Sequence, residues 1–283
     1  MQQEPLYEML DRILEVGRNG DGLFFMIIDP VKGEVVDEDL TDTWGYLLNG
    51  YHTVYQLDGI EAYRDAVLKV FNSLAGYQDH VWQPGSDYWG LGSADGDADA
   101  IEGALYLYNR EPVSSVEMWM DRQIQTMWSK QDSQDPRRDI YGDWNESGIV
   151  EGWHGDGNFA RTSTMYALWK TQGVHVNPWR EDVFYGAVEK DDKLFLAFFA
   201  EADWKGKLVF DHPRHRDHLN LPFDCPRLNQ YPEWFITEAD QQYVIRNVTN
   251  GEEKVYSDKE LRNGVWIQLE AGKEVQFIVE VNM

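Results

Sequence analysis

The sequence predicts an α+β protein of two domains, in which helices come first and antiparallel strands follow. Apolar residues recur every three or four positions through most of the first 175 residues, which is the period of an amphipathic helix. From about residue 183 the pattern changes to the alternation that is typical of strands. Runs of helices followed by runs of strands indicate segregated layers rather than a βαβ sheet. We therefore expect a helical domain over 1–178 and an antiparallel β domain over 179–283.

Composition limits the class of protein and its partners. The 283 residues, 42% of them hydrophobic, suffice for one large or two ordinary domains. A net charge of −25 argues against nucleic acid and membrane partners, because both require a basic surface. The single Cys225 excludes an intrachain disulfide and a cysteine-based metal site. We find no signal peptide after Met1, so we expect a cytoplasmic protein, or a periplasmic or secreted one if the chain is a mature or partial form.

Six helices are expected in the first domain, and glycine or proline ends most of them. The shortest link is the single residue Gly59, which joins the expected helices 42–58 and 60–74. Helices joined by so short a link pack as an antiparallel hairpin. A short strand or extended link is expected at 24–33. The expected helices are 4–17, 42–58, 60–74, about 97–109, about 114–130, and the segment that follows Asn158 and ends at Gly173.

The second domain alternates short apolar segments with turn signals. Asn250-Gly251 and Asn263-Gly264 are dipeptides typical of hairpin turns. A long polar insert, 212–234, interrupts the pattern. The expected strands are 184–188, 194–199, 208–211, 243–248, 265–269 and 275–281.

The stretch 148–166 concentrates glycine and polar side chains immediately before the sixth helix. Its glycines allow backbone conformations that other residues avoid, and a helix start favours hydrogen-bond acceptors and anionic groups. A tight turn in which Asp156 or Asn158 caps the helix is the alternative. Six polar or aromatic side chains within eleven residues exceed what a cap requires, so we interpret the stretch as a functional loop. These side chains are Glu151, Trp153, His154, Asp156, Asn158 and Arg161.

Carboxylates and aromatic rings are the candidates for chemistry on sugars. Paired carboxylates cleave glycosidic bonds, and sugar rings stack on Trp and Tyr, which are abundant here with 12 and 15 copies. Asp97 and Asp99 also suit the N-cap and first turn of a helix. The carboxylate candidates are Asp42, Asp95, Asp97, Asp99, Glu102, Glu151 and Asp156.

Two runs bear on metals. The run 95–99 imitates the first three ligand positions of an EF-hand, but Ala100 stands at position six and Tyr106 at position twelve, so we expect no EF-hand and leave a looser Ca²⁺ site open. The run His212–His218 mixes His, Arg and Asp. Zinc could use such histidines, but a solvated loop is the commoner structure, and an anionic sugar is another possible ligand. We therefore predict no metal site and no cofactor.

Helical hairpins with polar, aromatic-rich loops, followed by a β domain, resemble the (α/α) toroid carbohydrate-active enzymes with a β-sandwich-like domain. Within that group, 153–158 looks like the sugar-binding loop of unsaturated glucuronyl and rhamnogalacturonyl hydrolases, and 42–45 looks like their Asp-bearing helix start. The heparinase II/III-like polysaccharide lyases use Asn, His, Tyr and Arg. The residues of those types here are Asn158, His154, Tyr166 and Arg161.

The resemblance implies an enzyme that hydrolyses uronic-acid-containing glycans or oligosaccharides. The alternatives are a lyase that cleaves such glycans by β-elimination and a non-catalytic glycan-binding module. A complete toroid has twice as many helices as we expect here, so the chain would be a C-terminal portion of a longer enzyme or be completed by self-association. The catalytic candidates are Asp42, Asp99, His154, Asp156 and Tyr166. The substrate-binding candidates are Trp44, Trp89, Trp153, Asn158 and Arg161.

Overall fold

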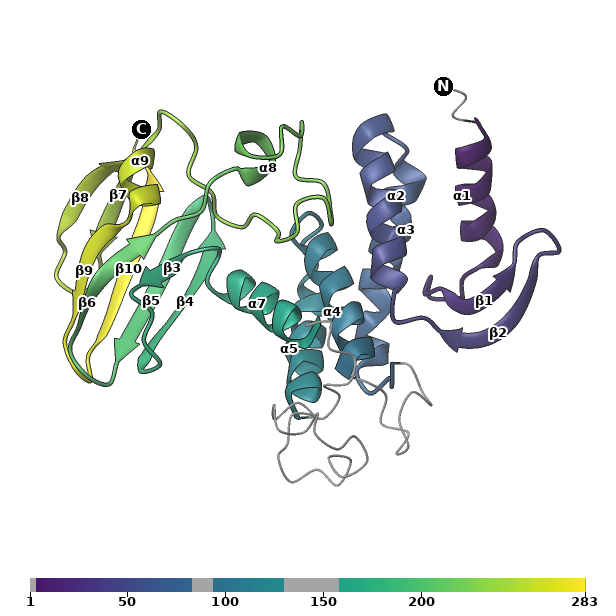
Figure 1. The fold of residues 1–283 in the computed structure, drawn as a ribbon, viewed down its shortest axis with the longest axis horizontal. Helices are drawn as coiled ribbons and strands as arrows, with labels where there is room; N and C mark the ends of the chain where they lie inside the picture. Colours follow the sequence, from purple (N-terminus) through teal and green to yellow (C-terminus); the bar gives the residue numbers. More distant parts are fainter. Residues whose placement is uncertain (1–3, 83–93, 130–157, 283) are drawn as a thin grey trace. The chain divides into compact units, whose positions relative to one another are not determined.

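The computed structural model describes residues 4–82, 94–129 and 158–282, and Figure 1 shows their elements. The expected mixed α+β class is confirmed. The chain divides into two compact units, Met1–Thr164 and Met165–Met283, which we call the helical unit and the β unit. The division falls inside helix α7 (Asn158–Lys170), earlier than the expected 178/179. It falls there because the second half of α7 packs within the β unit, where the rings of Trp169 and Trp234 are 6.4 Å apart.

Each of the six expected helical segments forms a helix. The sixth is α7, whose first half belongs to the helical unit. The others are α1 (Glu4–Val16), α2 (Trp44–Asp58), α3 (Glu61–Ser73), α4 (Ala94–Tyr108) and α5 (Ser114–Ser129), and a 3₁₀ turn, η1 (Leu74–Tyr77), follows α3.

The segment 24–33, expected to be a short strand or an extended link, contains the first strand and the turn of an antiparallel hairpin in the structure. The hairpin consists of β1 (Phe25–Asp29) and β2 (Glu34–Leu40). Strand β2 escaped prediction because it contains four acidic residues and is largely exposed, so it lacks the alternation that marks a half-buried strand.

Helices α2 and α4 lie side by side and run in the same direction. Tyr46, in the first turn of α2, bonds to Asp99 near the start of α4. His52, further along α2, contacts Glu111 just beyond the end of α4, with 3.0 Å between Nε2 and Oε1. Helices α3 and α5 each return beside their partner, so α2/α3 and α4/α5 form two hairpins. The N-termini of α2 and α4 therefore share one end of the helical unit.

A glycine pair permits the close approach of α2 and α4. A Cβ atom added to Gly103 would lie 2.5 Å from the Cα of Gly45, which is closer than real Cβ contacts come. Almost every residue of α4 is buried. A helix that is buried all round belongs in the interior of its unit, and small residues let its neighbours pack directly on its backbone.

The β unit contains two antiparallel sheets. The larger has the order β4-β5-β10-β7-β8 and the smaller the order β3-β6-β9. Phe198 on β5 and Val279 on β10 share one buried cluster with Leu208 on β6 and Leu269 on β9, so both sheets face the same core. The strands are β3 (His175–Asn177), β4 (Val183–Lys190), β5 (Lys193–Ala200), β6 (Trp204–Val209), β7 (Gln242–Asn247), β8 (Glu253–Ser257), β9 (Val265–Leu269) and β10 (Glu274–Val281).

Three details of the β unit differ from expectation. Strand β6 ends at Val209, whereas the expected strand was 208–211. The expected turn at 263–264 instead ends helix α9 (Asp258–Asn263), which begins with a capping box between Ser257 and Glu260. Strands β3 and β8 were not expected, because both are short edge strands with few buried residues. The turn at 250–251 was expected correctly, since it joins β7 to β8.

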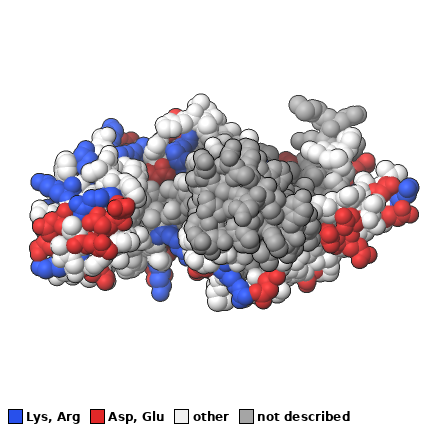
Figure 2. Space-filling view, turned by 60° about the horizontal axis from the view of Figure 1, so that its bottom comes forward, with Lys and Arg blue, Asp and Glu red and all other residues white. Residues whose placement is uncertain are grey.

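Negative charge is unevenly distributed along the chain. Most of the excess of acidic residues belongs to the helical unit. On the face drawn in Figure 2, acidic side chains gather at the right-hand end, where the β1–β2 hairpin lies, and the β unit carries both signs. Strand β2 contributes Glu34, Asp37, Glu38 and Asp39 to that end. In the part of the chain that the structure describes, no helix has both the length and the apolar character needed to cross a membrane.

We predict that Gly103→Ala lowers the free energy of unfolding by about 1–3 kcal/mol, because the new methyl group overpacks the contact with Gly45. The matched control is Gly50→Ala, which lies on the exposed side of α2 with no atom within 4 Å of the added methyl group. That substitution should stabilise the protein by about 0.5–1 kcal/mol. Urea unfolding followed by the helical circular dichroism signal measures both. An unchanged midpoint for Gly103→Ala would show that the helices are not in close contact.

Candidate active site

The starts of three helices bring polar side chains together in the helical unit. Helix α2 contributes Tyr46, helix α4 contributes Asp99 and Glu102, and helix α7 contributes Asn158 and Arg161. These helices are far apart in the sequence. The side chains of α4 contact those of both α2 and α7. We call the acidic side chains Asp42, Asp95, Asp99 and Glu102 the carboxylate cluster.

Glu102 is the most enclosed member of the carboxylate cluster, with a relative exposure of 1%. Its Oε1 accepts hydrogen bonds from Arg161 Nε (2.7 Å) and Thr162 Oγ1 (2.8 Å). Its Oε2 accepts from Arg161 Nη2 (2.5 Å) and Tyr46 Oη (2.9 Å). Each bond supports the charged carboxylate and joins α4 to α7 or α2. The hydrogen bonds from Arg161 to Glu102 in turn raise the pKa of the guanidinium.

Asp99 has a very different environment one turn earlier on α4. Burial raises the pKa of Asp99 to about 7, and the charges of Asp95, Asp42 and Glu102 add to the rise. The hydrogen bond from Tyr46, with 2.6 Å between Oη and Oδ1, opposes the rise because it also stabilises the ionised carboxylate. Near neutral pH a large fraction of Asp99 is therefore protonated and is able to give a proton away.

Three oxygen atoms form a row from Asp99 through Tyr46 to Glu102. The Tyr46 hydroxyl lies within hydrogen-bonding distance of both carboxylates but has a single hydrogen atom to donate. If both carboxylates are ionised, one contact in the row lacks a hydrogen. If Asp99 is protonated, it can donate to Tyr46 while Tyr46 donates to Glu102. The geometry therefore accommodates a proton on Asp99 without disturbing Glu102.

Asp42 and Asn158 flank Asp99. Asp42 immediately precedes the start of α2, is 3% exposed, and lies close enough for its charge to raise the pKa of Asp99. Asn158 opens α7, and its Nδ2 atom is 2.5 Å from Asp95 Oδ1 and 3.5 Å from Asp99 Oδ1. The structure thus brings together four of the predicted site residues, Asp42, Asp99, Asn158 and Arg161.

Two of the predicted site residues lie elsewhere. Trp44 is completely buried, and its ring packs 6.1 Å from that of Trp119 and 6.5 Å from that of Trp82. Because its side chain is buried in the core of the helical unit, Trp44 exposes no surface on which a sugar could stack. Tyr166 belongs to the β unit, where it packs edge to face against Trp169 and beside Lys170.

The remaining predicted residues cannot be placed. Most of the glycine-rich stretch precedes the described part of α7. The predicted site residues that lie outside the described residues are Trp89, Glu151, Trp153, His154 and Asp156.

The acidic run 95–99 does not form a calcium loop. It lies within α4, where residues two positions apart point to different sides of the helix. Asp97 is accordingly buried on another side than Asp95 and Asp99. Among the described residues, no group of three or more His, Cys, Asp or Glu side chains is placed to hold a metal ion.

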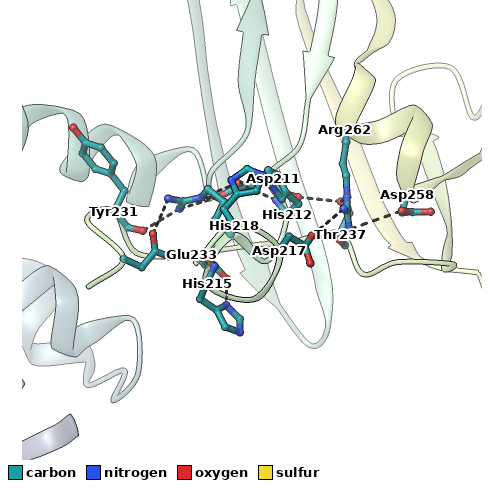
Figure 3. A network of polar contacts seen from close by, with 12 residues as sticks. Asp211, His212, His215, Asp217, His218, Tyr231, Glu233, Thr237, Asp258 and Arg262 are labelled. Atoms are coloured by element: carbon teal, nitrogen blue, oxygen red, sulfur yellow. Dashed lines mark hydrogen bonds and ion pairs between the residues drawn. The ribbon is translucent and has the colours of Figure 1, made fainter. Parts of the chain in front are cut away.

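The second polar cluster lies in the β unit and is shown in Figure 3. The run His212–His218 forms the short helix α8 (Arg214–Asp217) and its flanks. Arg214 bonds to Asp211 and to the carbonyl of Tyr231 (3.1 and 3.0 Å). His215 donates from Nδ1 to the buried carboxylate of Glu233 (2.7 Å). Because Arg214 and His215 are hydrogen-bonded to other groups of the protein, the run is an ordered network rather than the expected solvated loop.

Sequence reasoning missed Tyr46 and Thr162. Tyr46 follows Asp42 by four residues, so both would share one face of a helix, and this spacing was the available signal. Thr162 carries no signal in the sequence, because a threonine inside a helix usually bonds to its own backbone. Its bond to Glu102 exists only because α4 and α7 are adjacent.

We predict that Asp99 makes the protein less stable as pH rises from about 4 to about 7. An aspartate in the unfolded chain titrates near pH 4 and Asp99 titrates near 7, so the folded state holds the extra proton between these values. Asp99→Asn cannot ionise, and its free energy of unfolding should fall less over this range. The control is Asp65→Asn on the exposed side of α3. Urea unfolding at several pH values measures the slopes. Equal slopes for wild type and Asp99→Asn would contradict the raised pKa.

Comparison with known proteins adds no family to this description. A scan against models of protein families found none that matches the sequence, and a search of curated proteins found no similar one.

Proposed function

We propose that this protein is a carbohydrate-active enzyme that hydrolyses uronic-acid-containing glycans or oligosaccharides in its helical unit. The observation that carries the proposal is the pair of carboxylates at one end of parallel helices, with Asp99 held partly protonated beside Asp42. Two acids in environments that separate their protonation states are the usual apparatus of glycosidic cleavage. The same helix starts carry an asparagine and an arginine that suit a polar substrate.

The arrangement of helices supports an (α/α) toroid, or part of one. Two antiparallel hairpins pack so that α2 and α4 are parallel neighbours, with α4 buried on nearly all sides. Repetition of this unit would form an inner ring whose helix starts lie at one end. The two sheets of the β unit, which share a core, are in keeping with a sandwich-like second domain. Completion of the ring would come from further residues of a longer chain or from self-association.

In the proposed reaction, Asp99 protonates the glycosidic oxygen of the leaving sugar. Asp42 acts as the second carboxylate and activates water or attacks the sugar ring. Tyr46 holds the Asp99 carboxyl group in position and, when Asp99 is protonated, donates its hydrogen bond to Glu102 while keeping its own proton. No cofactor enters this scheme.

Arg161 has a narrower role here than the one expected of it. Its Nε and Nη2 atoms are both engaged by Glu102. A uronate carboxylate would therefore meet the Nη1 side of the guanidinium, so Arg161 both fixes Glu102 and offers a second contact to substrate. Asn158 lies one turn before Arg161, and its amide nitrogen contacts Asp95 and Asp99. Because the helical unit is acidic, an anionic sugar would have to be bound by such local groups, and nucleic acid or an anionic membrane is a poor partner for this surface.

We predict that the purified protein releases new reducing ends from at least one uronate-containing oligosaccharide. Asp99→Asn should lower the rate by at least about 100-fold, the usual contribution of a general acid, and Asp42→Asn should lower it similarly. Asp65→Asn, an exposed acid on α3, should leave it unchanged. The assay is reducing-end release over a broad panel, with near-ultraviolet absorbance recorded in the same samples.

The outcomes separate the alternatives. Absorbance from a 4,5-unsaturated uronate would mean β-elimination and would replace hydrolysis by a lyase reaction. Binding of glycans without turnover, and with the same affinity in Asp42→Asn and Asp99→Asn, would identify a non-catalytic module. Neither turnover nor binding across the panel would refute the proposed substrate class.

A further inference from the structure

Two histidines of the β unit face each other across the ends of the run His212–His218. Their Nε2 atoms are 3.3 Å apart, and their rings are 4.8 Å apart at an angle of 72° (Figure 3). Among the described residues, neither Nε2 atom has another hydrogen-bond partner. The pair is separate from the carboxylate cluster and has no part in the proposed hydrolysis.

We propose that His212 and His218 form an open binding site for a divalent transition metal ion such as Zn²⁺, with both Nε2 atoms as ligands. Zinc binds imidazole nitrogen at about 2.0–2.1 Å with tetrahedral angles, which places two such nitrogens about 3.3–3.4 Å apart. The observed separation of 3.3 Å between the two Nε2 atoms meets this requirement. The absence of a third His, Cys, Asp or Glu ligand in the described part of the chain leaves two positions for water or a small anion.

The backbone on both sides of the pair is held in place by one arginine. Arg214 bonds through its guanidinium to the carboxylate of Asp211, the residue that precedes His212. The carbonyl of Arg214 accepts a hydrogen bond from the N–H of His218 (2.9 Å). Asp211 is fixed in turn, because its carbonyl accepts from the N–H of Thr237 (3.0 Å). The two imidazoles are therefore presented by an ordered scaffold, which lowers the cost of binding a metal.

The charges around the pair suit a cation. Asp211 Oδ1 lies 3.8 Å from His212 Nδ1, on the side of the ring away from His218, as carboxylates behind metal-bound histidines do. Each of the nearby arginines is paired with an acid, which partly offsets its repulsion of a cation. The pairs are Arg214 with Asp211, Arg216 with Glu238, and Arg262 with Asp217.

A cavity lies beside one of the two histidines. His212 lines this cavity of about 300 Å³ together with Asp211, Arg214, His175 and Tyr231, whereas His218 does not line it. A cavity of this size holds several waters or a small anion. The competing description is a simple N–H···N hydrogen bond between the two rings, which requires a hydrogen on one Nε2. Metal binding displaces that hydrogen, so the two descriptions differ in a measurable way.

The test is titration of the chelator-treated full chain with Zn²⁺ by calorimetry, and with Co²⁺ by its visible spectrum. We expect saturable binding of one ion with tetrahedral Co²⁺ bands, and a loss of affinity of at least about tenfold in both His212→Gln and His218→Gln. His175→Gln is the matched control, because this exposed histidine lines the same cavity but is not part of the facing pair. It should bind as the wild type does.

A second measurement does not depend on the variants folding correctly. Imidazole ¹⁵N spectra of the wild type should show both Nε2 resonances shifting together on addition of Zn²⁺. Unchanged resonances, or equal Zn²⁺ affinity in all three variants, would overturn the proposal and leave the pair as a hydrogen bond.

Discussion

The buried carboxylate of Glu102 is the interaction on which the helical unit's site depends. It accepts hydrogen bonds from α2 and α7 while belonging to α4, so it links three helices that are distant in the sequence. A buried charge is tolerated only when its hydrogen bonds are made, and losing one partner of such a group typically costs several kcal/mol. Tyr46 and Arg161 are therefore held in position relative to each other, because both hydrogen-bond to the Glu102 carboxylate.

The contrast between Glu102 and Asp99 shows how one helix produces two different acids. The two residues are three positions apart on α4, so they share a side of the helix. Glu102 receives three hydrogen bonds from Arg161 and Thr162, whereas Asp99 is buried among other acids, and the two carboxyl groups share the single hydrogen of Tyr46. The environment rather than the residue type decides which carboxyl group keeps a proton at neutral pH. The raised pKa of Asp99 is the physical basis of its proposed role as the acid that protonates the glycosidic oxygen.

The β unit uses some of its arginines in the same way. Arg214 and Arg262 donate hydrogen bonds to carboxylates and backbone carbonyls within the β unit, although the protein as a whole is strongly acidic. The run that contains them is consequently ordered, and its two facing histidines are held by the scaffold rather than by each other. A basic cluster in a sequence can thus mark an internal network as readily as an anion-binding surface.

The sequence by itself determined the order of elements, because hydrophobic period and glycine position are local properties. It predicted the six α-helices that the described residues of the first part form, and it selected Asp42, Asp99, Asn158 and Arg161, since helix starts concentrate polar groups whatever the neighbours are. Only the tertiary structure decided that Trp44 is core, that Tyr46 reaches Asp99, and that Arg161 is occupied by Glu102. These facts depend on the contact of Gly45 with Gly103 and on α7 lying beside α4. The residues in these contacts are more than fifty positions apart. The apolar periodicity of one helix does not indicate which other helix it packs against.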